Sequence, residues 1–235
     1  MRLDLYLTKN FDIQSRNKAH EMIKSKKVKV DGKTILKPSF IVDDNSNIQL
    51  LEEDFYVSRA AYKLKYFLDE IKINLEDSEA LDIGSSTGGF TQILLQNSIK
   101  NVTCVDVGSN QLHHKIKDNK KIVFFEKQDI RTFKSDKQFD IITCDVSFIS
   151  ILNILKDIDR LAKKRIIILF KPQFEVGTNV KRDKKGVVKD KKAILKARQR
   201  FIDQTKLLNW TLKYNSQSKL EGKEGNEEEL FYFNK

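Results

Sequence analysis

The feature that most constrains the fold of this chain is a glycine-rich turn between an apolar strand pattern and a helix pattern. The strand pattern spans 80–83, the turn follows in the segment LDIGSSTGGF, and the helix pattern continues from Phe90. Gly84, Gly88 and Gly89 let the backbone turn sharply and let a ligand approach without obstruction by a Cβ atom. The free N–H groups at the start of the helix would point at that ligand, so the turn predicts a binding site.

An acidic residue beyond the turn indicates the kind of ligand. The apolar run 102–107 predicts a second buried strand, and Asp106 lies near its end. A carboxylate about 20 residues after a glycine turn is typical of hydrogen bonding to ribose hydroxyls, so we expect a nucleoside cofactor. The spacing G-x-x-x-G-G differs from the usual dinucleotide fingerprint. The alternative is an ordinary strand–turn–helix connection that binds no ligand, with Asp106 hydrogen-bonded within the protein.

Strand and helix patterns alternate through the rest of the chain, which is typical of a parallel sheet covered on both faces by helices. Strands are expected at 80–84, 102–107, 122–126, 139–145 and 165–171. Helices are expected at 88–97, 110–118, 150–162 and 189–206. Two closing segments, Trp210–Tyr214 and Glu228–Phe233, would pair as antiparallel strands at the edge. The predicted fold class is α/β, Rossmann-like, with a seven-stranded, mostly parallel sheet.

The first part of the chain predicts a separate, small α+β unit. Ser15 is an expected helix N-cap, and 28–33 is a strand that ends in an Asp-Gly hairpin turn. We expect one domain at 1–51, a linker at 52–57 and a larger domain at 58–235.

The charge of the chain favours a polyanionic partner. The chain has 44 Lys and Arg against 33 Asp and Glu, a formal net charge of +11. Within it, 15–37 carries eight basic and two acidic residues, and 181–200 carries ten basic and two acidic residues. Two such tracts are typical of nucleic-acid binding, with solvated lysine-rich faces as the alternative.

Composition also argues against several classes of protein. No apolar run approaches the roughly 18 residues of a membrane span, and no signal-peptide pattern opens the chain. Cys104 and Cys144 lie in strand patterns, so we expect buried free thiols and a cytoplasmic protein. Three histidines and no clustered cysteines give no zinc pattern, and no metal is expected.

Charged residues stand at the carboxyl ends of the expected strands, where open α/β sheets bind ligands. Asp145 follows the fourth strand and Lys171 ends the fifth, so both would face one crevice. Buried charges are costly unless they pair, so we expect these two to be partners; a purely structural pair is the alternative. Arg59 and Lys63 lie four residues apart, on one face of a helix ahead of the glycine turn.

The opening segment, which contains SRNKAHEMIKSKKVKVDGK, resembles the S4 RNA-binding domain. The resemblance implies a helix and turn whose basic face contacts folded RNA, chiefly through phosphates. The residues that it places there are Arg16, Lys18, Lys24, Lys26 and Lys27. A basic helix that binds no RNA is the alternative.

The remainder resembles the FtsJ/RrmJ-type ribose 2′-O-methyltransferases, and together with the S4-like domain it resembles the TlyA family, long described as haemolysins. The carrying segments are VSRAAYKL, LDIGSSTGGFT, CDVSFIS, LFKPQFE and EGNEEELFYF. The resemblance implies a class I methyltransferase with S-adenosylmethionine as methyl donor and a cytidine ribose of ribosomal RNA as substrate. It also implies a Lys–Asp–Lys–Glu tetrad, which falls on Lys63, Asp145, Lys171 and Glu228.

The chemistry of this reaction explains the residue types of the tetrad. A ribose hydroxyl is a poor nucleophile, so the enzyme must align it and remove its proton. We expect Lys171 to be the general base, with Lys63 favouring its neutral form. Asp145 and Glu228 would orient the two ammonium groups.

The resemblance also implies the contacts of the cofactor and of RNA. Asp106 would hold the cofactor ribose and Asp129 the adenine. The expected cofactor residues are Gly84, Ser85, Gly88, Gly89, Phe90, Asp106, Asp129, Ile130 and Asp145. Further RNA contacts are expected at Arg59, Arg182, Lys184 and Lys185. The chain lacks terminal extensions, which the resemblance associates with the subtype that methylates large-subunit (23S) RNA only.

Three other functions compete with this one. A membrane-active haemolysin would need an exposed amphipathic or spanning segment, whereas the apolar residues here follow buried patterns. An RNA-binding protein with an inactive methyltransferase core would fail to bind S-adenosylmethionine. A pseudouridine synthase is suggested by the triplet Arg2-Leu3-Asp4, but the triplet lies in the S4-like helix rather than in a catalytic domain.

Overall fold

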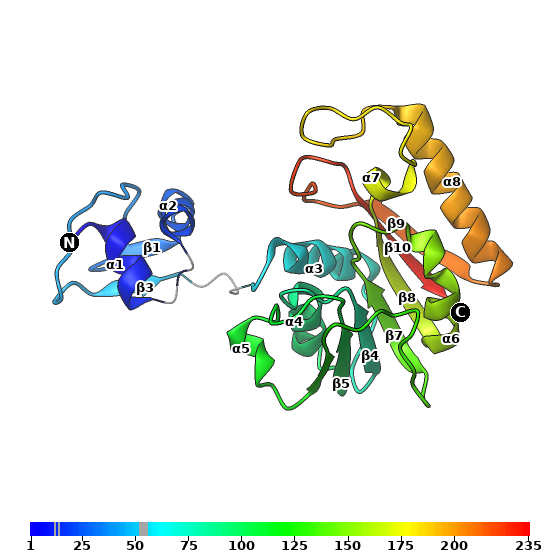
Figure 1. Ribbon diagram of the computed structural model, residues 1–235. Coiled ribbons are helices and arrows are strands. Elements are labelled where there is room, and N and C mark those ends of the chain that lie inside the picture. The colour runs from blue at the N-terminus through cyan, green and yellow to red at the C-terminus, as the bar shows by residue number, and fades with distance from the viewer. Residues whose placement is uncertain (12, 14, 52–55) are drawn as a thin grey trace. The chain divides into compact units, whose positions relative to one another are not determined.

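A computed structural model describes residues 1–11, 13, 15–51 and 56–235. The chain divides into two compact units, Met1–Phe55 and Tyr56–Lys235 (Figure 1). Most of the predicted linker at 52–57 lies outside the described residues. Each unit is therefore described by itself.

The first unit combines two helices with a three-stranded antiparallel sheet in the order β2-β1-β3. Its elements are α1 (Leu3–Asn10), α2 (Arg16–Lys24), β1 (Val28–Val30), β2 (Lys33–Thr34) and β3 (Ile48–Leu50). Ser15 caps α2 by accepting a hydrogen bond from the N–H of Lys18 at 3.2 Å, as predicted. Asp31 and Gly32 have φ of 50° and 78°, the left-handed pair that a type I′ hairpin turn requires, so the predicted hairpin is confirmed.

The second unit is built on a seven-stranded sheet in the order β6-β5-β4-β7-β8-β10-β9. Its strands are β4 (Glu79–Ile83), β5 (Asn101–Val105), β6 (Ile122–Phe125), β7 (Phe139–Cys144), β8 (Ala162–Phe170), β9 (Thr211–Gln217) and β10 (Glu229–Asn234). Its longer helices are α3 (Arg59–Ile71), α4 (Gly89–Gln96), α6 (Leu155–Leu161) and α8 (Lys191–Leu207). β10 pairs antiparallel with β8 and β9, and the other pairings are parallel. The predicted α/β class and antiparallel closing pair are confirmed.

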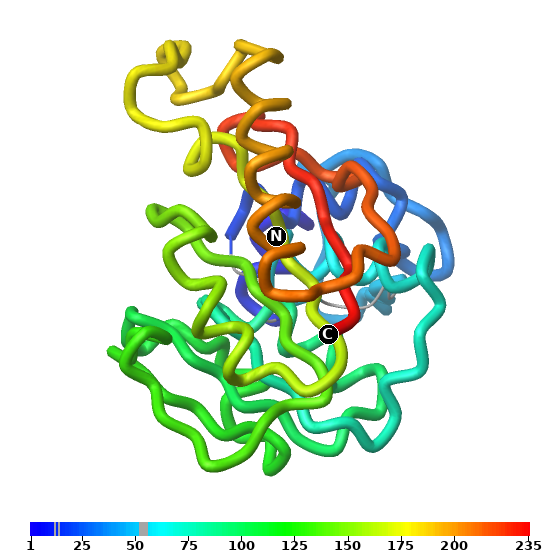
Figure 2. Tube along the Cα trace, turned by 90° about the vertical axis from the view of Figure 1, so that its right-hand side faces the viewer, coloured from blue at the N-terminus to red at the C-terminus, as the bar shows by residue number. Residues whose placement is uncertain are grey.

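Helices cover both faces of this sheet, as predicted (Figure 1). On β8, Ile166 and Ile168 belong to the core beneath α6 and α8, whereas Ile167 and Leu169 belong to the core beneath α3 and α4. A strand buried on both sides reads as a continuous apolar run, which explains why this segment shows no alternation. α8 runs alongside β10 (Figure 2), where it contributes to the first of these two cores.

Two helices are shorter than predicted. The helix expected at 110–118 is the single turn α5 (His114–Lys117), because Asn110 has a left-handed φ of 53° that an α-helix does not accommodate. The helix expected at 150–162 is divided into the 3₁₀ turn η1 (Ile151–Asn153) and α6. Within the described residues, no helix is both long and apolar enough to cross a membrane.

Candidate active site

The glycines of the turn are required by neighbouring protein atoms. Gly84 has φ of 75°, and a Cβ atom there would lie 2.9 Å from the carbonyl oxygen of Asp145. A Cβ atom on Gly89 would lie 2.1 Å from Ser58 Oγ, and one on Gly88 would lie 2.2 Å from the side chain of Ile116. The turn therefore needs glycine for close packing of its own fold. The prediction that a ligand uses the same space remains a prediction.

Two adjoining cavities open at the carboxyl ends of the strands. The larger, of about 300 Å³, is lined by an apolar set from β4, β5 and the loop after β7, together with Gly84, Asp106, Asp129, Ile130 and Asp145. The smaller, of about 180 Å³, shares Gly84 and Asp145 with it. Its other lining residues include Ser58, Ser85, Gly89, Phe90 and Lys171. The structure thus brings most of the predicted cofactor residues to one place, whereas Gly88 lies against α5.

Asp106 is held rigidly at the floor of the larger cavity. Its Oδ2 accepts a hydrogen bond from the N–H of Ser86 at 2.8 Å, and its Oδ1 accepts one from the N–H of Gly108 at 2.7 Å. Each carboxylate oxygen keeps a second lone pair for a ligand. This arrangement suits the two hydroxyls of a ribose.

Asp129 has a strong partner of its own. The guanidinium of Arg131 donates to both carboxylate oxygens, at 2.6 to 3.1 Å, and holds the pKa of Asp129 below its usual range. Ile130 is buried beside it. The predicted adenine contact of Asp129 would have to coexist with this ion pair.

Two buried hydroxyls in the smaller cavity have no hydrogen-bond partner among the described residues: Ser58 Oγ and Ser85 Oγ. Ser58 directly precedes α3, and Ser85 lies in the glycine turn just before α4. Buried polar atoms are normally hydrogen-bonded, so these hydroxyls indicate a polar ligand group. The start of α4 adds free N–H groups, which favour an anionic group such as a carboxylate. The two cavities therefore fit a ligand with a ribose at one end and a charged group at the other.

The predicted tetrad comes together from four elements. Lys171, after β8, pairs with Asp145, after β7, at 2.6 Å between Nζ and Oδ1. Lys63, in α3, pairs with Glu228, the residue before β10. The four side chains are between 3% and 15% exposed. The predicted pairing of Asp145 with Lys171 is confirmed.

The tetrad forms one electrostatic unit. Burial raises the pKa of Asp145, and the positive charges of Lys171 and Lys63 oppose this shift. The negative charge of Glu228 adds to it. Lys171 also donates to Ser147 Oγ at 2.8 Å, so its ammonium group has both a charged and a neutral acceptor.

Phe148 lines the larger cavity, although no role was predicted for it from the sequence. Its side chain is 93% exposed, its φ is 67°, and its ring centroid lies 5.4 Å from that of Phe174. An exposed aromatic side chain on a strained backbone is characteristic of a functional loop. The signal was present in the segment CDVSFIS, where Phe148 follows Asp145 by three residues.

The side chains of the first unit that are predicted to contact RNA differ in their protein contacts and in their exposure. Arg16 donates through Nε to the buried carboxylate of Asp4 at 2.9 Å, and Lys18 pairs with Glu21 at 3.1 Å. Lys24 and Lys26 are exposed, and Lys27 is partly buried.

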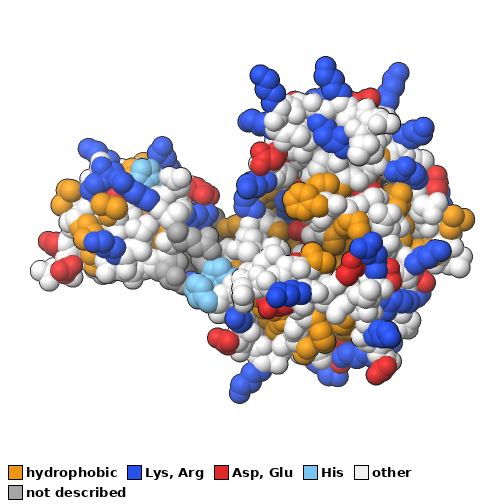
Figure 3. Space-filling view, in the orientation of Figure 1, with side chains coloured by type: hydrophobic (Ala, Val, Ile, Leu, Met, Phe, Trp, Pro, Cys, Tyr) orange, Lys and Arg blue, Asp and Glu red, His pale blue; other side chains and the backbone are white. Residues whose placement is uncertain are grey.

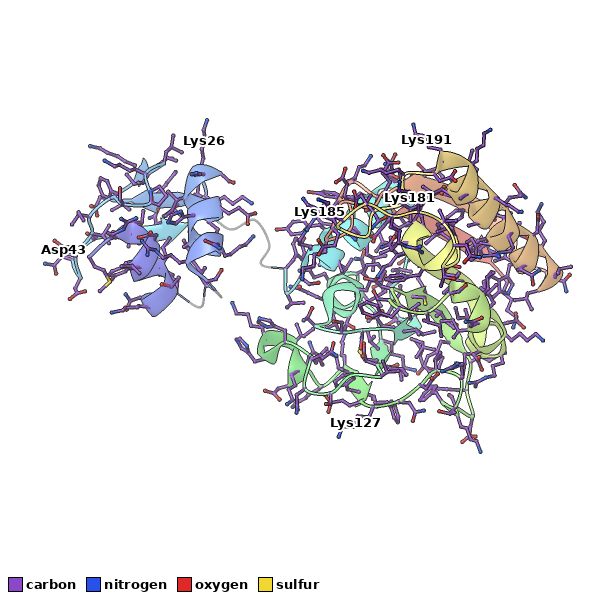
Figure 4. All side chains as sticks on the ribbon, turned by 45° about the horizontal axis from the view of Figure 1, so that its top comes forward. Lys26, Asp43, Lys127, Lys181, Lys185 and Lys191 are labelled. Atoms are coloured by element: carbon purple, nitrogen blue, oxygen red, sulfur yellow. The ribbon has the colours of Figure 1, made fainter. Side chains whose placement is uncertain are left out.

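The predicted RNA contacts of the second unit divide in the same way. Arg182 donates to the backbone carbonyls of Gln173, Gly177 and Val180, so it anchors its own loop rather than projecting from it. Arg59 donates to the carbonyl of Glu221 at 3.2 Å. Lys184 and Lys185 are exposed. Basic side chains gather at the end of the second unit that carries the loop before α8 (Figure 3), and Lys181, Lys185 and Lys191 are labelled there in Figure 4.

Comparisons with known proteins agree with this division of the chain. A model of the FtsJ-like methyltransferase family matches residues 56–235, and a model of the S4 domain matches residues 1–48. The chain is 50% identical to a 23S rRNA (cytidine-2′-O)-methyltransferase, TlyA, of Campylobacter jejuni, over 99% of both chains. It is 34% identical to a 16S/23S rRNA (cytidine-2′-O)-methyltransferase of Mycobacterium tuberculosis, over 75% of this chain and 68% of that one. A solved Streptococcus thermophilus structure whose description contains the word hemolysin has a TM-score of 0.73 and 30% identity, and covers 100% of this chain and 88% of that chain.

Proposed function

Because this chain belongs to the FtsJ-like methyltransferase family and carries an S4 domain at its N-terminus, we propose that it methylates the 2′-hydroxyl of a cytidine ribose in ribosomal RNA. The observation that carries this proposal is the buried Lys63–Glu228 and Lys171–Asp145 tetrad, which adjoins a cavity fitted to a nucleoside. Two relatives of this chain carry the description rRNA (cytidine-2′-O)-methyltransferase.

The two adjoining cavities would hold S-adenosylmethionine. Asp106 binds the ribose hydroxyls, and Asp129 and Ile130 line the space for the adenine. Ser58 and Ser85 donate their unpartnered hydroxyls to the carboxylate of the amino-acid part. When bound, this donor supplies an electrophilic methyl group on a sulfonium.

Lys171 is the general base of the proposed reaction. Its Nζ accepts the proton of the ribose 2′-hydroxyl as the oxygen takes the methyl group and the bond from that methyl group to the donor sulfonium breaks, so the amine of Lys171 becomes an ammonium group. Asp145 orients Lys171, and Glu228 orients Lys63.

Phe148 provides a platform for the target base. A nucleotide whose ribose reaches Lys171 must leave its stack, and an exposed aromatic ring replaces the lost stacking. Base–aromatic stacking contributes about 1–3 kcal/mol per base, which is enough to hold one cytosine in place. Its neighbour Ser147 touches Lys171, so the platform lies beside the base catalyst.

We propose the large ribosomal subunit as the substrate and the cytoplasm as the compartment. The identity to the relative described as a 23S rRNA methyltransferase is 50% over almost the whole of both chains, against 34% over part of the chain for the relative described as a 16S/23S rRNA methyltransferase. The S4 domain supplies the first RNA contacts through Lys24 and Lys26, and Lys184 and Lys185 supply contacts beside the catalytic site.

Methyl transfer to purified ribosomal subunits from a strain that lacks this gene tests the proposal. We expect label from S-adenosylmethionine to enter the large subunit, and Lys171→Ala to lower kcat by about 10²- to 10⁴-fold, the usual contribution of a general base. Lys171→Arg, which keeps the charge but cannot act as a base, should be as slow as Lys171→Ala.

A lysine outside the site provides the control. Lys163 lies at the other end of β8 and pairs with Asp140 at 3.1 Å, so Lys163→Ala removes a lysine and a more exposed ion pair of the same strand and should leave the rate unchanged. Equal rates for Lys171→Ala and the wild type would exclude Lys171 as the base. Cofactor binding without methylation of either subunit would exclude the proposed substrate.

A further inference from the structure

Glu175 is a buried carboxylate of the second unit that the proposed reaction does not use. It ends α7 (Pro172–Glu175), four residues after Lys171, and is 4% exposed. Its Oε2 accepts a hydrogen bond from Ser150 Oγ at 2.6 Å, and its Oε1 accepts one from the N–H of Ile151 at 2.8 Å. Both partners are neutral, and burial raises the pKa of Glu175. Because both carboxylate oxygens are hydrogen-bonded to the same neighbouring segment, Glu175 links that segment to α7.

One partner of Glu175, Ser150, ends the loop that carries the proposed stacking platform, and the other, Ile151, begins the 3₁₀ turn η1 directly after it. This loop, 145–150, leaves β7 and contains Asp145, Ser147 and Phe148, whereas Glu175 belongs to the segment 171–175 that leaves β8. Glu175 therefore links the C-terminal end of the loop 145–150 to the C-terminal end of the segment 171–175. The N-terminal ends of the two segments are linked by the Lys171–Asp145 ion pair and by the hydrogen bond from Lys171 to Ser147.

Phe148 lies between these two links, and its strained backbone needs the link through Glu175 to hold it. Phe148 has φ of 67°, a conformation that residues with a Cβ atom adopt only when their surroundings hold them there. Its side chain is almost fully exposed and has one aromatic contact, with Phe174 of α7. Fixing both ends of the loop to the segment 171–175 leaves Phe148 no relaxed alternative. The end of that segment is fixed in turn by Arg200, which donates to the carbonyl of Glu175 at 2.6 Å.

We propose that Glu175 is a positioning residue that holds Phe148 in register with Lys171, so that a base stacked on Phe148 places its ribose hydroxyl at Nζ of Lys171. This inference rests on the proposed function. It assigns to Glu175 no contact with RNA or with the cofactor. Glu175 acts through its hydrogen bonds to Ser150 and Ile151, and its charge is not required.

Variants at position 175 test whether Glu175 acts through its hydrogen bonds or through its charge. We expect Glu175→Ala to lower kcat at least 10-fold and to leave the Kd values of S-adenosylmethionine and of RNA within 2-fold of wild type. Glu175→Gln can accept from the N–H of Ile151 and donate to Ser150 Oγ, so it should restore kcat to within about 3-fold. A Glu175→Gln variant as slow as Glu175→Ala would overturn the proposal.

A double-mutant cycle with Phe148→Ala tests whether Glu175 acts through Phe148. Once the ring is absent nothing is left to position, so Glu175→Ala should slow the Phe148→Ala variant by less than 2-fold further. Multiplicative losses would overturn the proposal, and so would a loss of cofactor affinity. If Phe148→Ala itself were as fast as the wild type, the stacking platform of the proposed function would fail, and the role of Glu175 would fail with it.

A variant far from both loops tests whether a loss of stability alone lowers kcat. Asp159, on α6 and outside the cavities, accepts a hydrogen bond from Trp210 Nε1 at 2.8 Å and pairs with Lys235 at 3.2 Å, so Asp159→Ala removes two partly buried contacts without touching either loop. It should retain the wild-type kcat at temperatures where it is folded. If Glu175→Ala does not fold, Ser150→Ala removes one of the two bonds and should lower kcat in the same direction; an unchanged kcat would contradict the proposal.

Discussion

Asp82 is fully buried in β4, and its partners are hydroxyls rather than cations. Thr91 donates to its Oδ2 at 2.6 Å, and Thr143 donates to its Oδ1 at 2.8 Å. Burial raises the pKa of Asp82 to about 6 against the effect of these bonds. Between about pH 4 and pH 6 the folded protein thus keeps a proton that the unfolded chain has released, so the stability from Asp82 is lost as the pH rises.

We expect Asp82→Asn to stabilise the protein relative to wild type by an amount that grows with pH. The amide stays neutral and can still bond both threonines, so the gain between pH 4 and pH 7 should reach up to about 3 kcal/mol. Urea unfolding followed by the fluorescence of Trp210, the single tryptophan of the chain, reports on the same unit. Asp136→Asn, at an exposed position, is the control, and a gain from Asp82→Asn that did not vary with pH would contradict the assignment.

At the scale of elements, the start of α4 is decided by packing against α3. Glycine inside a helix is about 1 kcal/mol less favourable than alanine, so propensity alone predicts that alanine at position 89 would stabilise α4. A Cβ atom on Gly89 would lie 2.1 Å from Ser58 Oγ and 2.9 Å from the backbone nitrogen of Ala61. The two helices can approach this closely only because the side chain is missing. This approach also sets the place of Lys63, which α3 carries to the tetrad.

We therefore expect Gly89→Ala to lower the free energy of unfolding by about 1–3 kcal/mol, the usual cost of overpacking. The double variant Ser58→Ala/Gly89→Ala removes the closest contact but leaves the one with Ala61, so it should recover only part of this loss. Urea unfolding of the three proteins measures both effects. A single variant that was more stable than the wild type would show that propensity outweighs the crowding.

At the scale of the whole molecule, the charge of +11 is concentrated in two tracts of the chain, 15–37 and 181–200. In the second unit, Lys181, Lys185 and Lys191 lie at the end that carries the loop before α8, whereas Lys127 lies at the opposite end (Figure 4). Lys191 is the first residue of α8, where the helix dipole disfavours a cation. A cation kept in an unfavourable position is consistent with a surface built for phosphates.

We expect Lys185→Ala to weaken RNA binding and to reduce the slope of log K against log salt by about 0.7 to 0.9, the effect of one lost phosphate contact. Lys127→Ala changes the net charge equally and should alter neither quantity. Both lysines are exposed, so neither substitution disturbs the core. Binding of a ribosomal RNA fragment between about 50 and 200 mM salt, in the range where such slopes are measured, tests this. Equal effects of the two variants would mean that only the net charge matters.

The order of strands and helices, the glycine turn and the position of the site were predictable from local pattern. Hydrophobic runs identify strands buried on both faces, and the carboxyl ends of parallel strands meet at one edge of a sheet. That rule was sufficient to predict that Asp106, Asp145 and Lys171 lie together. The short α5 and the divided helix before β8 were not predictable, because single residues outside the α-helical region, such as Asn110 with φ of 53° and Ile154 with φ of −123°, interrupt a helix without changing its polarity pattern.

The amino-acid sequence alone was therefore enough to define the architecture and the chemistry that its strand ends present. Which charges pair depends on the folded chain, since Lys63 and Glu228 are separated by 165 positions and meet only through the packing of α3 beside β10. The fold also makes Arg182 an anchor of its own loop and Glu175 a link between the two catalytic loops. The difference comes from the range of the forces involved. Periodicity and turn chemistry act between near neighbours in the chain, whereas hydrogen bonds and ion pairs depend on distances that only the folded backbone sets.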